Sequence, residues 1–271
     1  MTYWNEKTAL VTGASRGLGL AIARQLVSQG ATVILTARDQ AGLDAAARTL
    51  ADLPGEAVPM AADVASDEAV AQLEKEIAAR FGRLDLLVNN VGVSSRGKLL
   101  ETPLADFRRQ WELNVITAIR CVQTFAPLLV RQKGHIVNIG SLASKSAARF
   151  LGPYATTKFG LAGFTHQLRL ELVDDGVHVL LVCPGPLTRD DAGNRYDDQA
   201  DDLPAEARRP GGGVKVKTID PQALAARILQ ACQRRQTELV VPAKARILFA
   251  VAQISSQWGD WLLAKFSSGR T

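Results

Sequence analysis

Apolar residues along the chain fall into short runs that alternate with longer stretches of helical spacing. The short runs are rich in β-branched residues and almost wholly apolar, which is typical of strands buried on both faces of a sheet. They cover residues 8–14, 31–38, 56–64, 84–91, 134–141, 177–185 and 237–242. The stretches between them predict helices at 18–30, 40–52, 67–82, 103–131, 153–174 and 220–235.

This alternation predicts the fold class. Strands that are each followed by a helix pair in parallel, and right-handed crossovers then place helices on both faces of the sheet. We therefore expect an α/β chain with a doubly wound, Rossmann-like parallel sheet of about seven strands. Asp39 and Asp220 precede predicted helices and are expected to be their N-caps, with Pro221 as a first helical residue. The length of 271 residues suits one domain over 1–271.

Two segments depart from the alternation. Residues 186–217 hold many acidic residues, three prolines and three successive glycines, so we expect a long loop that serves as a substrate loop or lid. Residues 243–266 carry apolar side chains at helical spacing, and we expect an amphipathic helical extension. Its predicted stripe consists of Ile247, Leu248, Val251, Ile254, Trp258, Trp261, Leu262 and Phe266.

Composition excludes several classes of protein. Three cysteines and three histidines are far apart in sequence, which argues against a disulfide framework and a metal site and fits a reducing, cytoplasmic location. No signal peptide is recognisable, and no apolar run is long enough to predict a spanning helix. The net charge is +5, concentrated in the last third of the chain. Without an aromatic-interleaved basic patch, we expect no nucleic acid partner.

A glycine-rich turn follows the first predicted strand. The sequence TGASRGLG places Gly13, Gly17 and Gly19 between a strand and a helix. Glycines let the backbone approach a pyrophosphate, and a helix N-terminus offers free N–H groups to it. This setting predicts a dinucleotide site.

The end of the second strand indicates which dinucleotide binds. An acidic residue there would bind the ribose 2′-hydroxyl of NAD. This chain has Arg38 instead, and Arg16 lies within the glycine turn. Guanidinium groups bind a 2′-phosphate that a carboxylate would repel. The sequence therefore favours NADP(H), and Asp39 is expected to cap the next helix.

Tyr154 and Lys158 lie one helical turn apart. A nearby ammonium favours the phenolate form and lowers the tyrosine pKa toward the range that acid–base catalysis requires. Ser141 ends a predicted strand at the ligand-binding edge of the sheet, and Asn114 is a polar residue within an apolar helix. Chance alone sometimes produces a tyrosine and a lysine at this spacing, so the prediction depends on Ser141 and Asn114 as well.

Together, the G-x-x-x-G-x-G turn and the Y-x-x-x-K pair resemble the short-chain dehydrogenase/reductase family over residues 8–188, and more loosely over 220–242. The resemblance implies that Asn114, Ser141, Tyr154 and Lys158 are catalytic. It also implies cofactor contacts from Gly13, Ser15, Arg16, Gly17, Leu18, Gly19, Arg38, Asp63, Val64, Asn90, Gly92, Tyr154, Lys158, Pro184, Gly185 and Thr188. Thr188 falls one residue early against the family pattern, and Val91 replaces an alanine.

The implied reaction is hydride transfer between nicotinamide and the carbon of a carbonyl or secondary alcohol. Tyr154 would serve as acid and base, Ser141 would hydrogen-bond the substrate oxygen, Lys158 would hold the ribose, and Asn114 would position a water. Two alternatives stay open, a catalytically silent NADP-binding regulatory protein and a 3-oxoacyl-thioester reductase. The extension shifts the expected substrate toward ketone, steroid-like or xenobiotic compounds.

The partners follow from the same features. We expect a small carbonyl or alcohol substrate and a homodimer or homotetramer. The apolar stripe of 243–266 fits a subunit contact, a flap over the substrate site or a peripheral membrane contact, because Lys244, Arg246 and Lys265 flank its two tryptophans.

Overall fold

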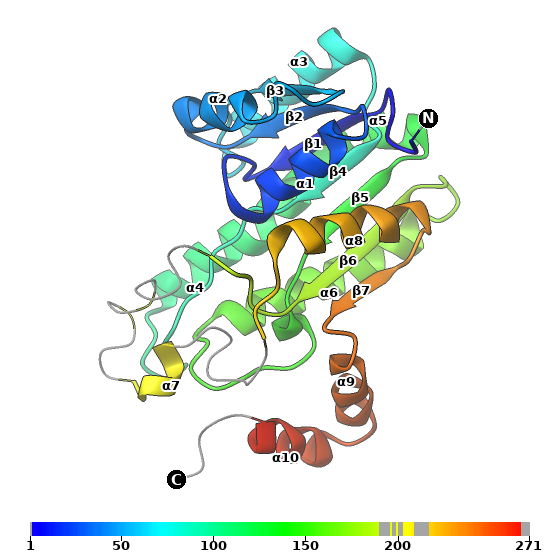
Figure 1. Ribbon diagram of the computed structural model, residues 1–271. Helices are drawn as coiled ribbons and strands as arrows, with labels where there is room; N and C mark the ends of the chain where they lie inside the picture. The colour runs from blue at the N-terminus through cyan, green and yellow to red at the C-terminus, as the bar shows by residue number, and fades with distance from the viewer. Residues whose placement is uncertain (1, 190–195, 197–198, 200–202, 209–216, 267–271) are drawn as a thin grey trace.

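The apolar runs form one parallel sheet. The computed structural model describes residues 2–189, 196, 199, 203–208 and 217–266, and within them seven strands pair in the order β3-β2-β1-β4-β5-β6-β7 (Figure 1). The strands are β1 Thr8–Thr12, β2 Thr32–Thr36, β3 Glu56–Pro59, β4 Leu86–Asn89, β5 His135–Ile139, β6 His178–Pro184 and β7 Glu238–Val241. The predicted doubly wound α/β fold is confirmed.

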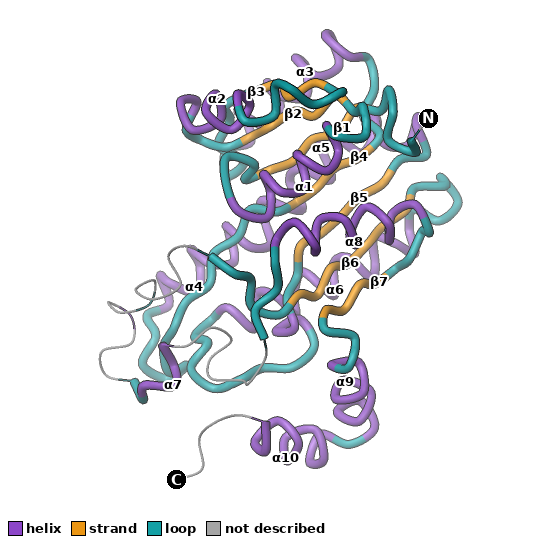
Figure 2. The backbone as a smooth tube through the Cα atoms, in the orientation of Figure 1, coloured by secondary structure: helices purple, strands orange, loops and turns teal. Residues whose placement is uncertain are grey.

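Helices cover both faces of the sheet (Figure 2). One face carries α1 Gly17–Val27, α2 Gln40–Arg48 and α8 Pro221–Gln233, and the other carries α3 Asp67–Phe81, α5 Thr117–Gln132 and α6 Tyr154–Glu171. Side chains alternate between the faces along each strand, so Val11 packs in the first core cluster and Leu10 in the second. Asp39 and Asp220 accept hydrogen bonds from the first backbone N–H groups of α2 and α8, which confirms both predicted caps.

The predicted helix at 103–131 is interrupted. It consists of α4 Leu104–Trp111, a π-helical turn η1 at Glu112–Ile116, and α5. By length and composition the combined helix Leu104–Gln132 could cross a membrane, but half of its most apolar window is buried. Phe125, Leu128 and Leu129 lie in the second core cluster. We therefore assign it as a core helix.

The segment after β6 returns to the sheet before α8. Leu187 and Ile219 form a parallel bridge, and the short helix α7 spans Ala205–Arg208. Of the predicted loop at 186–217, residues 190–195, 197–198, 200–202 and 209–216 lie outside the described residues.

The extension predicted at 243–266 is helical, and it consists of two helices, α9 Ala245–Ile254 and α10 Ser256–Phe266. The helix breaks at Ser255, whose backbone is extended, and Gly259 packs against Ala252 so closely that a Cβ there would lie 2.6 Å from the alanine methyl. The buried anchor of α9 is Phe249, which the predicted stripe omits. The side chain of Phe266, a member of that stripe, lies outside the description.

Candidate active site

The glycine turn after β1 has a backbone that only glycine adopts easily. Gly13 and Gly17 have φ angles of +63° and +60°. A Cβ on Gly19 would collide with the Gly13 carbonyl oxygen and lie 2.7 Å from the amide nitrogen of Asn90. Helix α1 begins without a side-chain cap and without an acidic residue in its first turn. Its first N–H groups are therefore available to an anion.

Four of the predicted cofactor residues surround this turn. Ser15 is half-buried, and Leu18 packs beneath the turn in the first core cluster. The guanidinium-bearing Arg16 and Arg38 are both exposed and follow the adjacent strands β1 and β2. The two positive charges therefore lie at the same edge of the sheet as the turn.

Asn90 connects the turn to the end of β4. Its side-chain amide donates to the carbonyl oxygens of Thr12, at 2.9 Å, and Gly13, at 3.2 Å. β1 and β4 are neighbours in the sheet although five other elements, α1 to α3 with β2 and β3, separate them in sequence. This is the topological switch point, where open α/β sheets bind their ligands.

Asp63 and Val64 follow β3 at the same edge. Asp63 is exposed, and its carboxylate accepts the Ala65 N–H at 3.0 Å. Val64 is buried in the second core cluster, and its carbonyl oxygen accepts a hydrogen bond from Arg120. The structure thus leaves Asp63 accessible and gives Val64 a packing role.

Asn114 lies in the π-helical turn, a local widening that is common at functional sites. Its side-chain oxygen accepts the Val93 N–H at 2.7 Å, and its nitrogen donates to the Val93 carbonyl at 2.9 Å. The same nitrogen donates at 2.9 Å to Thr157, whose hydroxyl donates to the Tyr154 carbonyl. Asn114 therefore joins the loop after β4 to the first turn of α6.

Lys158 is a buried ammonium, with 4% of its surface exposed. Its Nζ donates at 2.8 Å to the carbonyl oxygen of Ile139, the last residue of β5, and lies 5.8 Å from the centre of the Tyr154 ring. Burial lowers the pKa of Lys158 to about 8. A Cβ on Gly92 would lie 3.4 Å from this Nζ and 3.1 Å from the side-chain oxygen of Asn114. Gly92 therefore faces both groups.

Ser141 begins the turn after β5. Its backbone N–H donates to the Ser144 hydroxyl at 3.1 Å, and its own hydroxyl accepts the Ala143 N–H at 3.1 Å. This reciprocal capping fixes the short 3₁₀ helix η2 Leu142–Ser144 beside the strand end that holds Lys158.

The segment after β6 is held by backbone pairing. Pro184 is buried as the last residue of β6, and the Gly185 N–H donates to the Val241 carbonyl at 2.7 Å. Thr188 is exposed, and its N–H donates to the Ile219 carbonyl. Its predicted contact with the cofactor stays a prediction.

Sequence reasoning missed a cluster next to this site. The Ser94 hydroxyl lies 2.6 Å from the Tyr196 hydroxyl, and the guanidinium of Arg96 lies 3.7 Å from the Tyr196 ring centre. Arg96 is buried, and its Nε donates to the Ala207 carbonyl. In the sequence, the one feature that could have indicated this cluster is Tyr196, a single tyrosine in the acidic segment 186–217.

Comparison with known proteins identifies relatives over most of the chain. The family described as short chain dehydrogenase matches residues 7–200. Ketoacyl reductase HetN from Nostoc sp. is 31% identical over 94% of this chain and 87% of its own length. A 3-oxoacyl-[acyl-carrier-protein] reductase from Synechocystis sp. is 36% identical over 70% of this chain and 78% of its own.

Solved structures resemble the fold closely. A metagenomic short-chain oxidoreductase in complex with NADP is 34% identical, with a TM-score of 0.72 over 88% of this chain and 98% of that one. L-Sorbose reductase from Gluconobacter frateurii, complexed with NADPH and L-sorbose, is 26% identical, with a TM-score of 0.77 over 88% of this chain and 95% of that one.

The buried ammonium generates a prediction about stability. Between pH 8 and 10.5 the unfolded chain keeps the Lys158 proton that the folded chain has released, because burial lowers the folded pKa from 10.5 to about 8. The free energy of unfolding of the cofactor-free wild type should therefore rise with pH relative to Lys158→Met, by up to about 3 kcal/mol across this window. Urea denaturation of both proteins at several pH values measures the difference, and a flat difference contradicts it.

Proposed function

The chain belongs to the short-chain dehydrogenase family, and we propose that it is an NADP(H)-dependent oxidoreductase that reduces a carbonyl or oxidises the matching secondary alcohol. One observation carries the proposal. Asn114 and Lys158 face Gly92 at the switch point of the sheet, and Tyr154 lies one helical turn from Lys158. The glycine turn meets them at the same edge, where it supplies a backbone cradle for the dinucleotide.

Each residue of the site is proposed to have a separate role in the reaction, which its contacts support. When bound, the cofactor supplies or accepts the hydride at the substrate carbon. In reduction, Tyr154 donates its hydroxyl proton to the carbonyl oxygen, and in oxidation it takes the proton back. The Lys158 ammonium, 5.8 Å from the ring centre, favours the phenolate and so brings the Tyr154 pKa nearer to neutrality. Ser141 donates a hydrogen bond to the substrate oxygen as charge develops.

Asn114 is proposed to position a water that returns the proton to the site. Its amide already holds the loop at Val93 and the first turn of α6, so it also fixes the distance between them. The remaining cofactor contacts predicted from the sequence, from Ser15 to Thr188, are part of this proposal.

The choice of NADP(H) over NAD rests on the exposed Arg16 and Arg38 at the ends of adjacent strands. Asp39 does not compete for a ribose hydroxyl, since its carboxylate caps α2. The NADP and NADPH complexes of the two structural relatives support the same cofactor.

For the substrate we propose two candidates. The ketoacyl and 3-oxoacyl reductases among the relatives favour a 3-oxoacyl thioester. The C-terminal helices favour a more apolar ketone, because α9 packs through Phe249 into a cluster that includes Leu142, the neighbour of Ser141. We propose residues 186–217 as the substrate loop, since Tyr196 and Ala207 contact Ser94 and Arg96 beside the site.

We also propose two contact surfaces on a cytoplasmic protein. Phe159 and Leu170 are exposed on one side of α6, three turns apart, and support a homodimer or homotetramer. On α9 and α10, Ile247, Ile254, Trp258 and Trp261 are between 58% and 81% exposed. Lys244, Arg246 and Lys265 outnumber the single acid Asp260 there, so an anionic membrane surface suits these helices.

Substitution of the proposed acid tests the function. Tyr154→Phe keeps the ring and removes the proton, so NADPH oxidation should fall about 100-fold to 10,000-fold while NADPH still binds. Steady-state assays with 3-oxoacyl thioesters and simple ketones, together with NADPH titration, measure both. Near-normal turnover in the variant would show that Tyr154 is not the acid and base of the reaction. A wild type that binds NADPH and reduces no carbonyl in the panel would favour the regulatory alternative.

Cofactor preference is tested at the end of β2. Arg38→Ala removes a charge-assisted hydrogen bond to the 2′-phosphate, so the KM for NADPH should rise about 10-fold to 100-fold while that for NADH stays unchanged. Arg48→Ala, an exposed arginine in the last turn of α2, is the matched control and should alter neither value. An equal rise for both cofactors would show that Arg38 does not read the phosphate.

Two double variants test the proposed subunit surface on α6 and the proposed membrane surface on α9 and α10 separately. Trp258→Ser with Trp261→Ser should abolish co-sedimentation with anionic phosphatidylglycerol vesicles and leave the oligomeric state unchanged. Phe159→Ser with Leu170→Ser should have the reverse effect, because its side chains lie on α6. Vesicle pelleting and sedimentation velocity provide the measurements. Loss of the oligomer in the tryptophan variant, with no vesicle binding by the wild type, would instead identify α9 and α10 as a subunit contact.

A further inference from the structure

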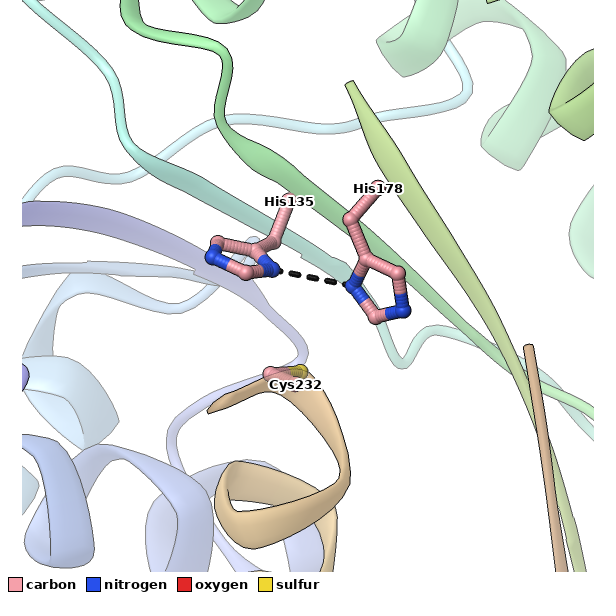
Figure 3. A group of neighbouring side chains, drawn as sticks. All are labelled: His135, His178 and Cys232. Carbon is pink, nitrogen blue, oxygen red and sulfur yellow. Dashed lines mark hydrogen bonds between the residues drawn. The ribbon is translucent and has the colours of Figure 1, made fainter. Parts of the chain in front are cut away.

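Two buried histidines meet at the edge of the sheet opposite the candidate active site. His135 and His178 are the first residues of β5 and β6, and they are direct partners in the parallel register. Their Nδ1 atoms lie 2.9 Å apart (Figure 3). Cys232, from α8, is fully buried beside them, and its sulfur and one nitrogen of each ring lie within 4.8 Å of one another. The sequence separates these residues widely, and the fold brings them together.

The outer nitrogens of both rings already have partners. His178 Nε2 lies 2.7 Å from the Gln236 carbonyl oxygen, which only accepts, so this nitrogen carries a proton. The Nδ1 of neutral His178 is then bare and accepts from Nδ1–H of His135. His135 Nε2 in turn accepts from the Tyr3 hydroxyl at 2.7 Å. This assignment satisfies every ring nitrogen with both imidazoles neutral.

The Gln236 carbonyl and the Tyr3 hydroxyl would also suit the two histidines if both bound a metal ion. Histidine ligands usually donate their second N–H to a carbonyl or other oxygen, which fixes the ring orientation. Gln236 provides such an acceptor for His178, and the Tyr3 oxygen accepts as readily as its hydroxyl donates. When a cation binds between the rings, the Nδ1 proton of His135 moves to its Nε2, which then donates to the Tyr3 oxygen. The thiol proton of Cys232 is released to solvent. No outer partner has to move.

We propose that His135, His178 and Cys232 form a binding site for one soft, singly charged cation, Cu⁺. Imidazole and thiolate ligands both suit copper, and thiolate selects its reduced ion. A thiolate with two neutral imidazoles carries one negative charge, so Cu⁺ makes the buried site neutral. Zn²⁺ would leave a net positive charge beside Arg235 and Lys7, whose charges already act on His135.

The geometry requires a small adjustment. Metal–nitrogen bonds of about 2.0 Å place two nitrogens of a three-coordinate site roughly 3.5 Å apart. The rings therefore separate by about half an ångström from their present contact, and the cysteine sulfur moves toward them. Side-chain rotation provides both movements. The bound ion would tie together β5, β6, α8 and, through Tyr3, the beginning of the chain, so it should raise the Tm without being needed for turnover.

Copper competition tests the site on the whole protein. Under anaerobic, reducing conditions, the wild type should withdraw one Cu⁺ per chain from a coloured bicinchoninate complex, and X-ray absorption should show one sulfur and two nitrogen neighbours. Cys232→Ala should weaken binding by about 100-fold or more. His178→Gln provides an independent variant should Cys232→Ala fail to fold. Cys121→Ala, a buried cysteine on the other face of the sheet, is the matched control and should bind as the wild type does.

Three results would overturn the proposal. One is no Cu⁺ binding by the folded wild type at the concentration of the competitor. Another is binding that persists in both Cys232→Ala and His178→Gln, which places copper elsewhere. The third is selective binding of Zn²⁺ over Cu⁺, which contradicts the charge argument. NADPH oxidation, measured in parallel, should be the same with and without copper. If the copper proposal is wrong, the proposed oxidoreductase activity is therefore unaffected.

Discussion

Parallel pairing of β1 with β4 is the constraint on which the functional edge of this molecule depends. The two strands are adjacent in the sheet, and the chain leaves them in opposite directions, β1 toward β2 and β4 toward β5. Connections on both sides of the pair therefore diverge, and an opening remains above it. At the base of this opening, the Asn90 side-chain amide joins the ends of β4 and β1 by donating to the carbonyl oxygens of Thr12 and Gly13. The glycine turn, Asn90 and Gly92 lie at the same edge of the sheet because the strands that precede them run parallel.

The buried Lys158 shows what this arrangement costs. Its ammonium is removed from water, which lowers its pKa to about 8, and its hydrogen bond to the Ile139 carbonyl offsets only part of this cost. An apolar residue of similar length would avoid that penalty. The stability of the cofactor-free chain is therefore lower than its apolar core alone would provide, which is the expected trade between stability and a working site. A bound dinucleotide phosphate or ribose would offset part of the cost.

Much of the fold was predictable because its signals are local. Strand patterns such as 8–14 and 177–185 are nearly all apolar, and Asp39 and Asp220 cap helices through contacts within three residues. The prediction of the four catalytic residues depended on the order and spacing of the sequence motifs. The π-helical turn at Asn114 was not predictable, since it depends on the distant Val93 and Thr157. The pairing of His135 with His178 depends on strand register, which spacing along the sequence does not reveal.

The C-terminal helices illustrate how a correct periodicity leads to an incomplete structure. Apolar spacing indicated a stripe through 243–266, but spacing alone could not show that Ser255 breaks the helix or that Gly259 lets α10 cross α9 closely. Phe249 joins Leu181, Cys183 and Val240 of β6 and β7 in one cluster, and Leu142, the neighbour of Ser141, packs against the same cluster. α9 is therefore anchored at the β7 edge of the sheet, close to the turn that begins at Ser141, and α10 packs in turn on α9.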